Sequence, residues 1–333
     1  MAWLMSRLSL LMDDWKLLAL MLLVLACLIA GTVAGRMLEA TAGRDQRRFA
    51  MVANFQARVR SWWLMAAVFA LAVLIGEIGA ILLFACCSFL ALREFVCIVP
   101  TRRADHRTLV WCFWVILPLQ YWFIYIGWYG MFVLLIPLYA FLFIPMRNVL
   151  AGDCEHFLER TAKIQWGITC CIYCISHTPM LLKLDCDFGD GVAAATANAR
   201  LLWFLVMVVE LSDVLQYCWG KSLGQHKLLP RVSPNKTVEG LVGGVLSATL
   251  LGGVLSVFTP LSVWQGTVIA LLIALAGFAG DVTMSAIKRD SGVKDYGTML
   301  AGHGGMLDRL DSLCFAAPVF FHVIRYCFLS PNP

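Results

Sequence analysis

The 333-residue chain is 61% hydrophobic and only 14% charged, whereas soluble globular chains carry about 45–50% apolar and about 25% charged residues. This composition excludes an ordinary soluble domain and predicts an all-α polytopic membrane protein. The net charge of +5 does not indicate nucleic-acid binding, because the basic residues lie in short loops between apolar runs. No nucleic-acid partner is expected, and membrane lipids are the expected surroundings.

The apolar runs predict about ten transmembrane helices, since a run of about 20 apolar residues can cross a bilayer as a helix. In chain order the runs cover residues 17–35, 62–80, 81–97, 109–126, 129–146, 164–182, 198–219, 239–259, 264–287 and 312–329. The second and third form one continuous apolar stretch around Glu77 and Gly79. That stretch is too long for one ordinary helix, so a tight hairpin is expected there.

Loop charges predict the orientation, because Lys and Arg accumulate in cytoplasmic loops. Basic residues dominate the alternate loops 36–61, 98–108, 147–163 and 220–238, whereas the loop 183–197 is acidic. This alternation predicts an N-out/C-out protein. We expect it to be integral to a bacterial inner (cytoplasmic) membrane. We divide the chain into two parts: residues 1–60 form an additional N-terminal helix with its basic cytoplasmic loop, and residues 61–333 form one membrane domain.

A dense polar segment, 285–312, precedes the last apolar run. If the preceding helix continues into it, Asp281, Ser285 and Lys288 lie on one helical face. If the last helix begins near 306–308, Asp308 and Asp311 share a face at its mouth. Carboxylates without nearby Cys or paired His favour Mg²⁺ over zinc, and the neighbouring basic residues suit phosphate. The segment therefore predicts chemistry on a polyphosphate.

The run of glycines before Asp308 supports this interpretation, because glycine lets backbone N–H groups approach an anion closely and a helix N-terminus favours negative ligands. A second polar segment, 210–244, lies in a loop predicted to be on the same side. It carries Glu210 and Asp213 late in an apolar run, followed by several Lys, Ser and Thr residues. Its Gly-Lys-Ser at 220–222 lacks the preceding glycine of a Walker loop.

These two segments resemble one known family. The signature of the phosphatidate cytidylyltransferases, also called CDP-diacylglycerol synthases, is similar to the run Ser285-x-x-Lys288-Arg289, Lys294-Asp295 and His303-Gly304-Gly305-x-x-Asp308-Arg309-x-Asp311. The earlier segment is similar to the family in Asp213, Tyr217, Gly220-Lys221 and Gly224 and in Ser233-Pro234-x-Lys236-Thr237-x-Glu239-Gly240. Glu94 also stands where the family tends to carry Glu. The resemblance covers residues 60–330, approximately.

The resemblance implies transfer of CMP from CTP to phosphatidate at the cytoplasmic leaflet, giving CDP-diacylglycerol and pyrophosphate. Mg²⁺ is the implied cofactor, and a second cation such as K⁺ is compatible with the same site. The implied metal ligands are Asp281, Asp308 and Asp213. The residues expected to bind CTP or phosphate are Lys221, Ser233, Lys236, Thr237, Ser285, Gly304 and Gly305. The expected catalytic residues are Lys288, Arg289, Lys294, His303 and Arg309, and a homodimer is compatible with the sequence.

The chain departs from the family pattern at two places. Ala301 replaces a proline before the glycine run, and Val214-Leu215-Gln216 replaces Ser-Gly-Ala between Asp213 and Tyr217. The second change predicts a bulkier pocket wall, so the lipid acceptor is phosphatidate or a related lipid phosphate. Two other functions stay open: a CTP-dependent polyprenol or lipid kinase, and a membrane transporter with intramembrane carboxylates.

Overall fold

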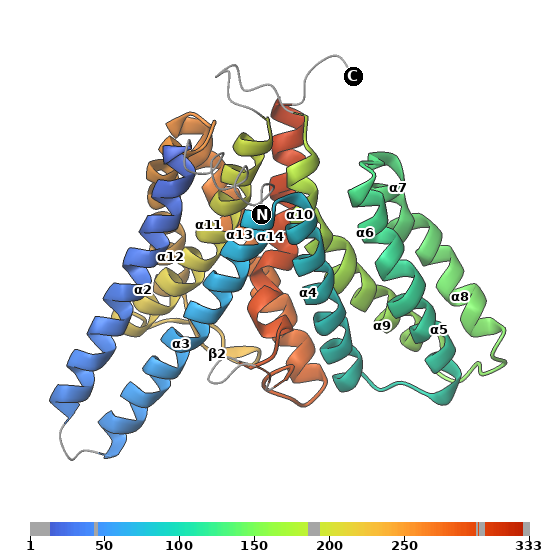
Figure 1. Ribbon diagram of the computed structural model, residues 1–333. Coiled ribbons are helices and arrows are strands. Elements are labelled where there is room, and N and C mark those ends of the chain that lie inside the picture. Colours follow the sequence, from blue (N-terminus) through green and yellow to red (C-terminus); the bar gives the residue numbers. More distant parts are fainter. Residues whose placement is uncertain (1–13, 43–45, 186–193, 298, 300–303, 329–333) are drawn as a thin grey trace.

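The computed structural model describes residues 14–42, 46–185, 194–297, 299 and 304–328. Long helices dominate this part of the chain (Figure 1). They are α2 (Trp15–Ala42), α3 (Gln46–Ile75), α4 (Glu77–Ile98), α11 (Ala194–Ser222), α12 (Val238–Leu255), α13 (Val263–Asp290) and α14 (Leu307–Phe328). The prediction of an all-α polytopic membrane protein is confirmed.

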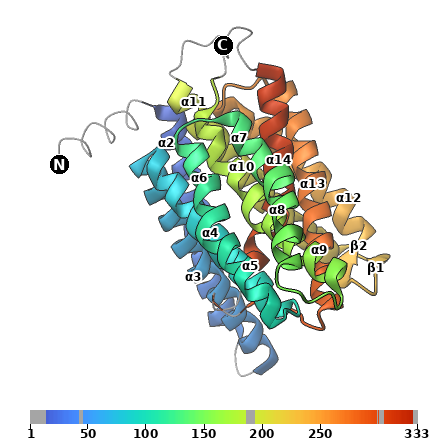
Figure 2. The same ribbon diagram turned by 90° about the vertical axis from the view of Figure 1, so that its right-hand side faces the viewer.

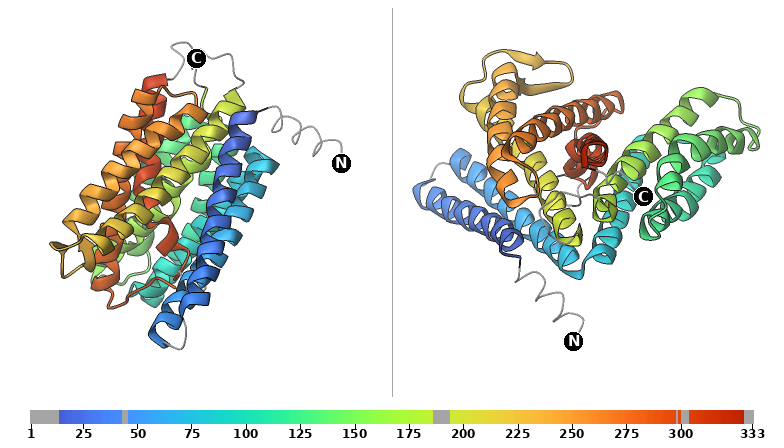
Figure 3. Two further views of the ribbon diagram at one scale, coloured as in Figure 1. Left: turned by 90° about the vertical axis from the view of Figure 1, so that its left-hand side faces the viewer. Right: turned by 90° about the horizontal axis from the view of Figure 1, so that it is seen from above.

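The chain between α4 and α11 is built from shorter helical segments that follow one another. In chain order these are η1 (Arg103–Asp105), α5 (His106–Trp111), η2 (Cys112–Ile116), α6 (Leu117–Tyr125), α7 (Tyr129–Leu134), η3 (Leu135–Ala140), α8 (Phe141–Val149), α9 (Phe157–Ile168), η4 (Thr169–Cys174), α10 (Ile175–Met180) and η5 (Leu181–Lys183). Three of them, η2, η3 and η4, are π-helical. Seen from above, α5 to α9 extend away from α2, α3 and α11 to α13, and α14 lies between the two groups (Figure 3).

Nine helices in the described ranges are long and apolar enough to cross a membrane. Nine of the predicted runs coincide with them. The sixth run, 164–182, falls on α9, η4 and α10, which are not among the nine. The count of ten and the orientation in the membrane therefore stay predictions.

The hairpin predicted within the long apolar stretch is confirmed. α3 ends at Ile75 and α4 begins at Glu77, with Gly76 between them at a φ of 89°. Glycine adopts this left-handed conformation without the steric cost that a side chain brings. The Glu77 carboxylate lies 2.5 Å from the Lys183 ammonium, which ties the turn to the end of η5.

Residues 227–237 form a small antiparallel hairpin that the sequence analysis did not predict. Strand β1 (Lys227–Leu229) pairs with β2 (Ser233–Thr237), with Lys227 opposite Thr237 and Leu229 opposite Ser233. The hairpin projects beside the lower ends of α12 and α13 (Figure 2). It lies at the same end of the bundle as the α4–α5 and α8–α9 connections and the loop before α14 (Figure 1). We call this end the polar end.

A buried ion pair fixes the first helix at the opposite end. Arg200, near the start of α11, donates from Nε to Asp14 Oδ2 at 2.8 Å and from Nη2 to Asp14 Oδ1 at 2.5 Å. Both side chains are buried. The Asp14 carboxylate also accepts the backbone N–H groups of Lys16 and Leu17 in the first turn of α2. A paired, hydrogen-bonded charge of this kind holds α2 against α11.

Candidate active site

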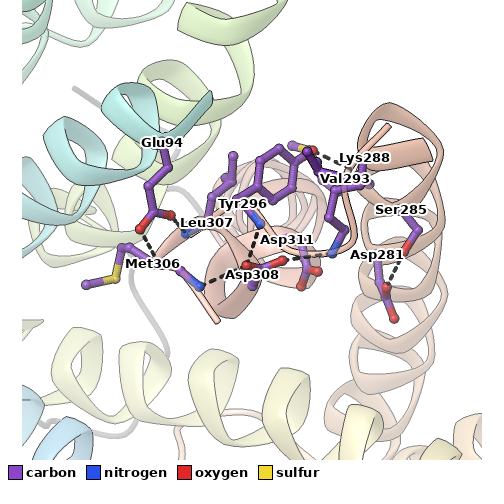
Figure 4. Close-up of polar contacts among 12 residues, drawn as sticks. Glu94, Asp281, Ser285, Lys288, Val293, Tyr296, Met306, Leu307, Asp308 and Asp311 are labelled. Carbon is purple, nitrogen blue, oxygen red and sulfur yellow. Dashed lines mark hydrogen bonds and ion pairs between the residues drawn. The ribbon is translucent and has the colours of Figure 1, made fainter. Parts of the chain in front are cut away.

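Close packing of α13 and α14 builds the centre of the polar end. A Cβ atom placed on Gly280 would lie 2.4 Å from the backbone oxygen of Asp311, and one placed on Gly277 would lie 3.5 Å from Cβ of Ser312. Small residues let two membrane helices approach in this way. The contact at Gly280 puts the next residue, Asp281, beside the first turns of α14. Figure 4 shows Asp281, Asp308 and Asp311 gathered around this contact.

Asp281 lies on the face of α13 that the sequence predicts. The helix continues to Asp290, and Ser285 Oγ donates to Asp281 Oδ1 at 3.3 Å. The ammonium of Lys236, from β2, forms an ion pair with Asp281 Oδ2 and lies 4.6 Å from the centre of the Phe278 ring. The predicted Asp281, Ser285 and Lys236 are therefore brought together.

Asp308, by contrast, is hydrogen-bonded to Lys288 and to two backbone N–H groups that precede α14. Its Oδ1 accepts a hydrogen bond from Lys288 Nζ at 2.8 Å. Its Oδ2 accepts the backbone N–H groups of Tyr296 at 2.8 Å and Gly305 at 2.9 Å. Asp308 and Lys288 are both buried. Because three donors already satisfy this carboxylate, the geometry favours a structural role, and metal binding by Asp308 stays a prediction.

Tyr296 closes the same contact from the other side. Its ring centre lies 5.3 Å from Lys288 Nζ, and its hydroxyl donates to the backbone oxygen of Met284 at 3.0 Å. Burial is the main cause that raises the pKa of Tyr296 above its ordinary value, and nearby Asp308 and Asp311 add to it. The phenol therefore stays protonated and keeps donating. Lys288 is thereby enclosed between an aromatic ring and a carboxylate.

Asp311 is the functional candidate that the predicted ligand set omitted. It is buried one turn after Asp308, and its Oδ1 accepts the backbone N–H of Ser312 at 2.8 Å. Its electrostatic neighbours are Asp281, Asp213, Lys288 and Arg309. The helical spacing of three residues from Asp308 is the sequence signal that could have added it.

α11 contributes two further acidic side chains. Asp213 interacts electrostatically with Glu210 and Asp281, and Glu210 interacts with Arg309 and Asp311. We call Asp213, Asp281 and Asp311 the crowded carboxylates, because each has like charges among its neighbours. They come from three different helices, α11, α13 and α14.

The donor chemistry of this cluster suits a divalent cation. Carboxylates from three helices lie near the cationic side chains of Lys236, Lys288 and Arg309. An all-oxygen donor set is the kind that Mg²⁺ prefers. Within the described ranges, however, no three His, Cys, Asp or Glu side chains are already close enough to hold a metal ion. Binding would therefore require side-chain rotation.

The predicted phosphate-binding residues of the second polar segment divide into two kinds. Lys236 points into the cluster, whereas Lys221 is exposed, with its Nζ 5.7 Å from the Tyr217 ring centre. Ser233 begins β2 and is partly exposed. Thr237 is buried, and its Oγ1 accepts the N–H of Gly240 at 3.1 Å as the N-cap of α12. A phosphate contact by Thr237 stays a prediction.

The predicted catalytic cations are also separated. Arg289 is exposed and donates to the backbone oxygens of Val232 and Val293, both at 3.1 Å, so it ties the β-hairpin to the loop after α13. Lys294 is exposed. Arg309 is half-buried beside Glu210 and Asp311, and its Nε has no hydrogen-bond partner within the described part of the chain. His303 and Ala301 lie outside the described residues.

Backbone N–H groups at the start of α14 are engaged by carboxylates. Gly304 turns the chain at a φ of 77°. The N–H of Gly305 donates to Asp308, and those of Met306 and Leu307 donate to Glu94 Oε1 at 2.9 Å and Oε2 at 2.8 Å. Asp308 accepts the Gly305 N–H in this structure, and phosphate contacts at Gly304 and Gly305 stay predictions. We call Glu94 and Asp308 the anchoring carboxylates.

Part of the departure at 214–216 lies in helix contacts, and its effect on a pocket wall stays a prediction. Leu215 packs against a buried apolar cluster of α12 and α13, made of Val245, Ala248 and Ala274. The Gln216 amide donates to Ser212 Oγ at 2.9 Å, and its backbone would lie 2.6 Å from a Cβ placed on Gly244. Two of the three changed residues thus serve helix packing, and only Val214 is exposed.

Comparisons with known proteins identify the family of this chain. The model of the cytidylyltransferase family matches residues 56–327. A protein of Escherichia coli (strain K12) described as uncharacterized protein YnbB is 43% identical over 273 residues, which cover 81% of this chain and 87% of the relative.

Shorter matches come from staphylococcal proteins that are named phosphatidate cytidylyltransferase. The Staphylococcus epidermidis protein is 41% identical over 122 residues, 36% of this chain and 47% of the relative. The Staphylococcus saprophyticus protein is 42% identical over 118 residues, 35% of this chain and 45% of the relative. These matches span about half the length of the named enzymes. Because the family model covers most of the chain, the protein belongs to the cytidylyltransferase family.

Proposed function

We propose that this protein transfers the cytidylyl group of CTP to a lipid phosphate, with phosphatidate as the first candidate, in a Mg²⁺-dependent reaction that releases pyrophosphate. The observation that carries the proposal is the meeting of carboxylates from α11, α13 and α14 with cationic side chains at the polar end. Family membership and the staphylococcal relatives support the choice of CTP and of a lipid phosphate.

The proposed reaction requires positioning and charge stabilisation from the protein but no strong general base. An oxygen of the lipid phosphate monoester attacks the α-phosphorus of CTP, a new P–O bond forms, and the bond between the α-phosphorus and the bridging oxygen to the β-phosphorus breaks. Pyrophosphate leaves with that oxygen. No strong general base is required, because the second pKa of a phosphate monoester is about 6 and the attacking group is already largely ionised at neutral pH. Two anions must nevertheless meet, so charge stabilisation and positioning are the main catalytic needs.

The crowded carboxylates are the proposed metal ligands. This set keeps the predicted Asp213 and Asp281 and replaces Asp308 with Asp311. Asp213, Asp281 and Asp311 bring hard oxygen donors from three helices to one region. These three carboxylates would hold Mg²⁺, which would supply Lewis-acid stabilisation of the charge that develops on the phosphate. Ser285 orients Asp281 through its hydrogen bond. A second cation such as K⁺ stays a prediction.

Lys236 and Arg309 are the proposed phosphate-binding cations. Lys236 is only partly buried and stands on a hairpin, so its ammonium can exchange Asp281 for a phosphate oxygen. Arg309 carries a guanidinium with an unpartnered Nε beside Asp311. Guanidinium groups bind phosphate through paired N–H donors. Lys288, enclosed by Asp308 and Tyr296, acts in this scheme by holding the loop.

We assign the polar end to the cytoplasmic side of a bacterial inner membrane. The loops at this end include the basic ones of the sequence, which favours a cytoplasmic location, and CTP is available there. The N-terminal division at residue 60 and a homodimer stay predictions.

A lipid panel tests this proposal. Purified protein in lipid nanodiscs is supplied with CTP, Mg²⁺ and one lipid phosphate at a time, and pyrophosphate, CDP and lipid products are measured. We expect pyrophosphate and a CDP-lipid in equal amounts, and none of either with Asp281→Asn. Release of CDP with a phosphorylated lipid would identify a kinase, and no turnover with any lipid phosphate would contradict the proposal.

A further inference from the structure

Glu94 lies on α4, more than two hundred residues before the motif that it contacts. Its two carboxylate oxygens accept one backbone N–H each, from Met306 and Leu307, at the very start of α14. Such donors lack partners within their own helix. A carboxylate placed there also interacts favourably with the positive end of the helix dipole. α4 thus caps α14 from outside.

The loop before α14 is shaped around this carboxylate. A Cβ atom on Gly305 would lie 2.3 Å from Glu94 Oε2, and one on Gly297 would lie 2.8 Å from Oε1. Any side chain at Gly305 would therefore displace the carboxylate. The two glycines that enclose Glu94 explain part of the glycine content of this segment without a phosphate ligand.

The three consecutive N–H groups at the start of α14 are divided between the two anchoring carboxylates. Gly305 donates to Asp308, and Met306 and Leu307 donate to Glu94. This division fixes how α14 is rotated about its axis at its first turn. Asp311 follows one turn later, and the same rotation directs it toward Asp281 and Asp213. A small rotation would carry Asp311 away from both.

The basic side chain that follows α4 does not pair with Glu94. Arg102 lies 2.5 Å from Glu155 and 3.5 Å from Asp153. Within the described ranges no ion pair involves Glu94. Its contacts are instead with the backbone of the loop and of α14.

We propose that Glu94 is a positioning residue, which sets the rotation and the start of α14 so that Asp311 can join Asp281 and Asp213 at the cation site. This proposal rests on the proposed function for its catalytic consequence. Its structural part, the dependence of cation binding on Glu94, does not require turnover. Residues that orient metal ligands typically change metal affinity about 10-fold to 100-fold when they are replaced.

The test compares Glu94→Gln and Glu94→Asp with Glu77→Gln. Glu77 is a matched control because it lies at the other end of α4 and contacts Lys183. For each purified protein, the thermal unfolding midpoint is followed as Mg²⁺ is added, which gives the Mg²⁺ concentration for half-saturation. The kcat and KM for CTP are then measured with the best lipid phosphate.

We expect Glu94→Gln to raise the half-saturating Mg²⁺ concentration about tenfold or more and to lower kcat with little change in KM for CTP. Glu94→Asp keeps the charge, so its Mg²⁺ dependence should lie between those of Glu94→Gln and the unchanged protein, and Glu77→Gln should match the unchanged protein. An unaltered Mg²⁺ dependence in Glu94→Gln would overturn the proposal. If Glu94→Gln does not fold, Glu94→Asp decides in the same way.

The two proposals can fail separately. If the unchanged protein shows no cytidylyl transfer but Glu94→Gln still weakens Mg²⁺ binding, the proposed function fails and the positioning role stands. If the unchanged protein is active and Glu94→Gln binds Mg²⁺ and turns over normally, the positioning role fails alone.

Discussion

Two groups of carboxylates lie at the polar end of this protein, and they differ in what surrounds them. The anchoring carboxylates, Glu94 and Asp308, both lie close to the start of α14, and both accept backbone N–H groups. The crowded carboxylates, Asp213, Asp281 and Asp311, have like charges as neighbours. Because a like charge nearby disfavours an ionised carboxylate, the crowded group is the one that a cation would stabilise. The anchoring group builds the frame.

Replacing a crowded carboxylate should have the largest effect on transfer. We expect Asp311→Asn to lower the rate of pyrophosphate release about 1,000-fold or more, because a bound cation contributes several kcal/mol and about 1.4 kcal/mol is a factor of ten. The unfolding temperature should stay unchanged or rise, since like-charge repulsion is relieved.

The matched control for Asp311→Asn is Asp290→Asn, at the exposed end of α13. It should leave both the rate and the unfolding temperature near their starting values. If Asp311→Asn instead unfolded the protein and kept normal activity in its folded fraction, Asp311 would belong with the anchoring group.

Replacing an anchoring carboxylate should affect stability first. Asp308→Asn leaves the buried Lys288 ammonium without its partner, and breaking a buried pair on one side typically costs about 3–5 kcal/mol. Thermal unfolding should register this loss, and activity should fall together with the folded fraction. The double variant Asp308→Leu with Lys288→Met should recover part of the stability. An Asp308→Asn protein of normal stability that no longer binds Mg²⁺ would restore Asp308 as a metal ligand.

Replacing Lys236, which pairs with the crowded carboxylate Asp281, should have a smaller effect than replacing a carboxylate. Lys236→Met should raise the KM for CTP about tenfold, which corresponds to about 1.4 kcal/mol of lost binding. It should also lower the half-saturating Mg²⁺ concentration, since Asp281 loses a competing cation. Lys227→Met, on the same hairpin and exposed, should change neither. A Lys236→Met protein that needs more Mg²⁺ would contradict the comparison.

The smallest effect on transfer is expected from the far end of the molecule. Asp14→Asn removes one partner of the buried pair with Arg200 and should weaken the attachment of α2, which thermal unfolding would detect. The transfer rate of the folded protein should stay within about a factor of two, because surface and remote changes rarely alter distant sites strongly. A large loss of the transfer rate would show that the attachment of α2 is needed for activity.

The sequence alone could predict most of the long helices and their boundaries. The apolar runs marked the long helices, and the length of the stretch around Glu77 required the hairpin that Gly76 forms. The helical spacing of Asp281, Ser285 and Lys288 was confirmed because α13 continues to Asp290. The start of α14 at Leu307 also agreed with the expectation. These features depend on local pattern, which a sequence displays directly.

What sequence could not predict depends on contacts between distant residues. The motif Asp308-Arg309-x-Asp311 contains two similar carboxylates, and only their surroundings separate them. The role of Glu94 requires knowing that the end of α4 meets the start of α14. The β-hairpin was missed because its strands have three and five residues, too few for a clear alternating pattern.

Cation binding separates the two groups most directly, because we propose that the crowded carboxylates, and not the anchoring ones, bind the divalent cation. Mn²⁺, a paramagnetic substitute for Mg²⁺, is titrated into the purified protein, Asp311→Asn and Asp290→Asn, and binding is followed by electron paramagnetic resonance. We expect Asp311→Asn to weaken Mn²⁺ binding at least about tenfold in a protein that remains folded, while Asp290→Asn binds as the unchanged protein does. Equal Mn²⁺ affinity in all three proteins would show that Asp311 is not a ligand of the cation.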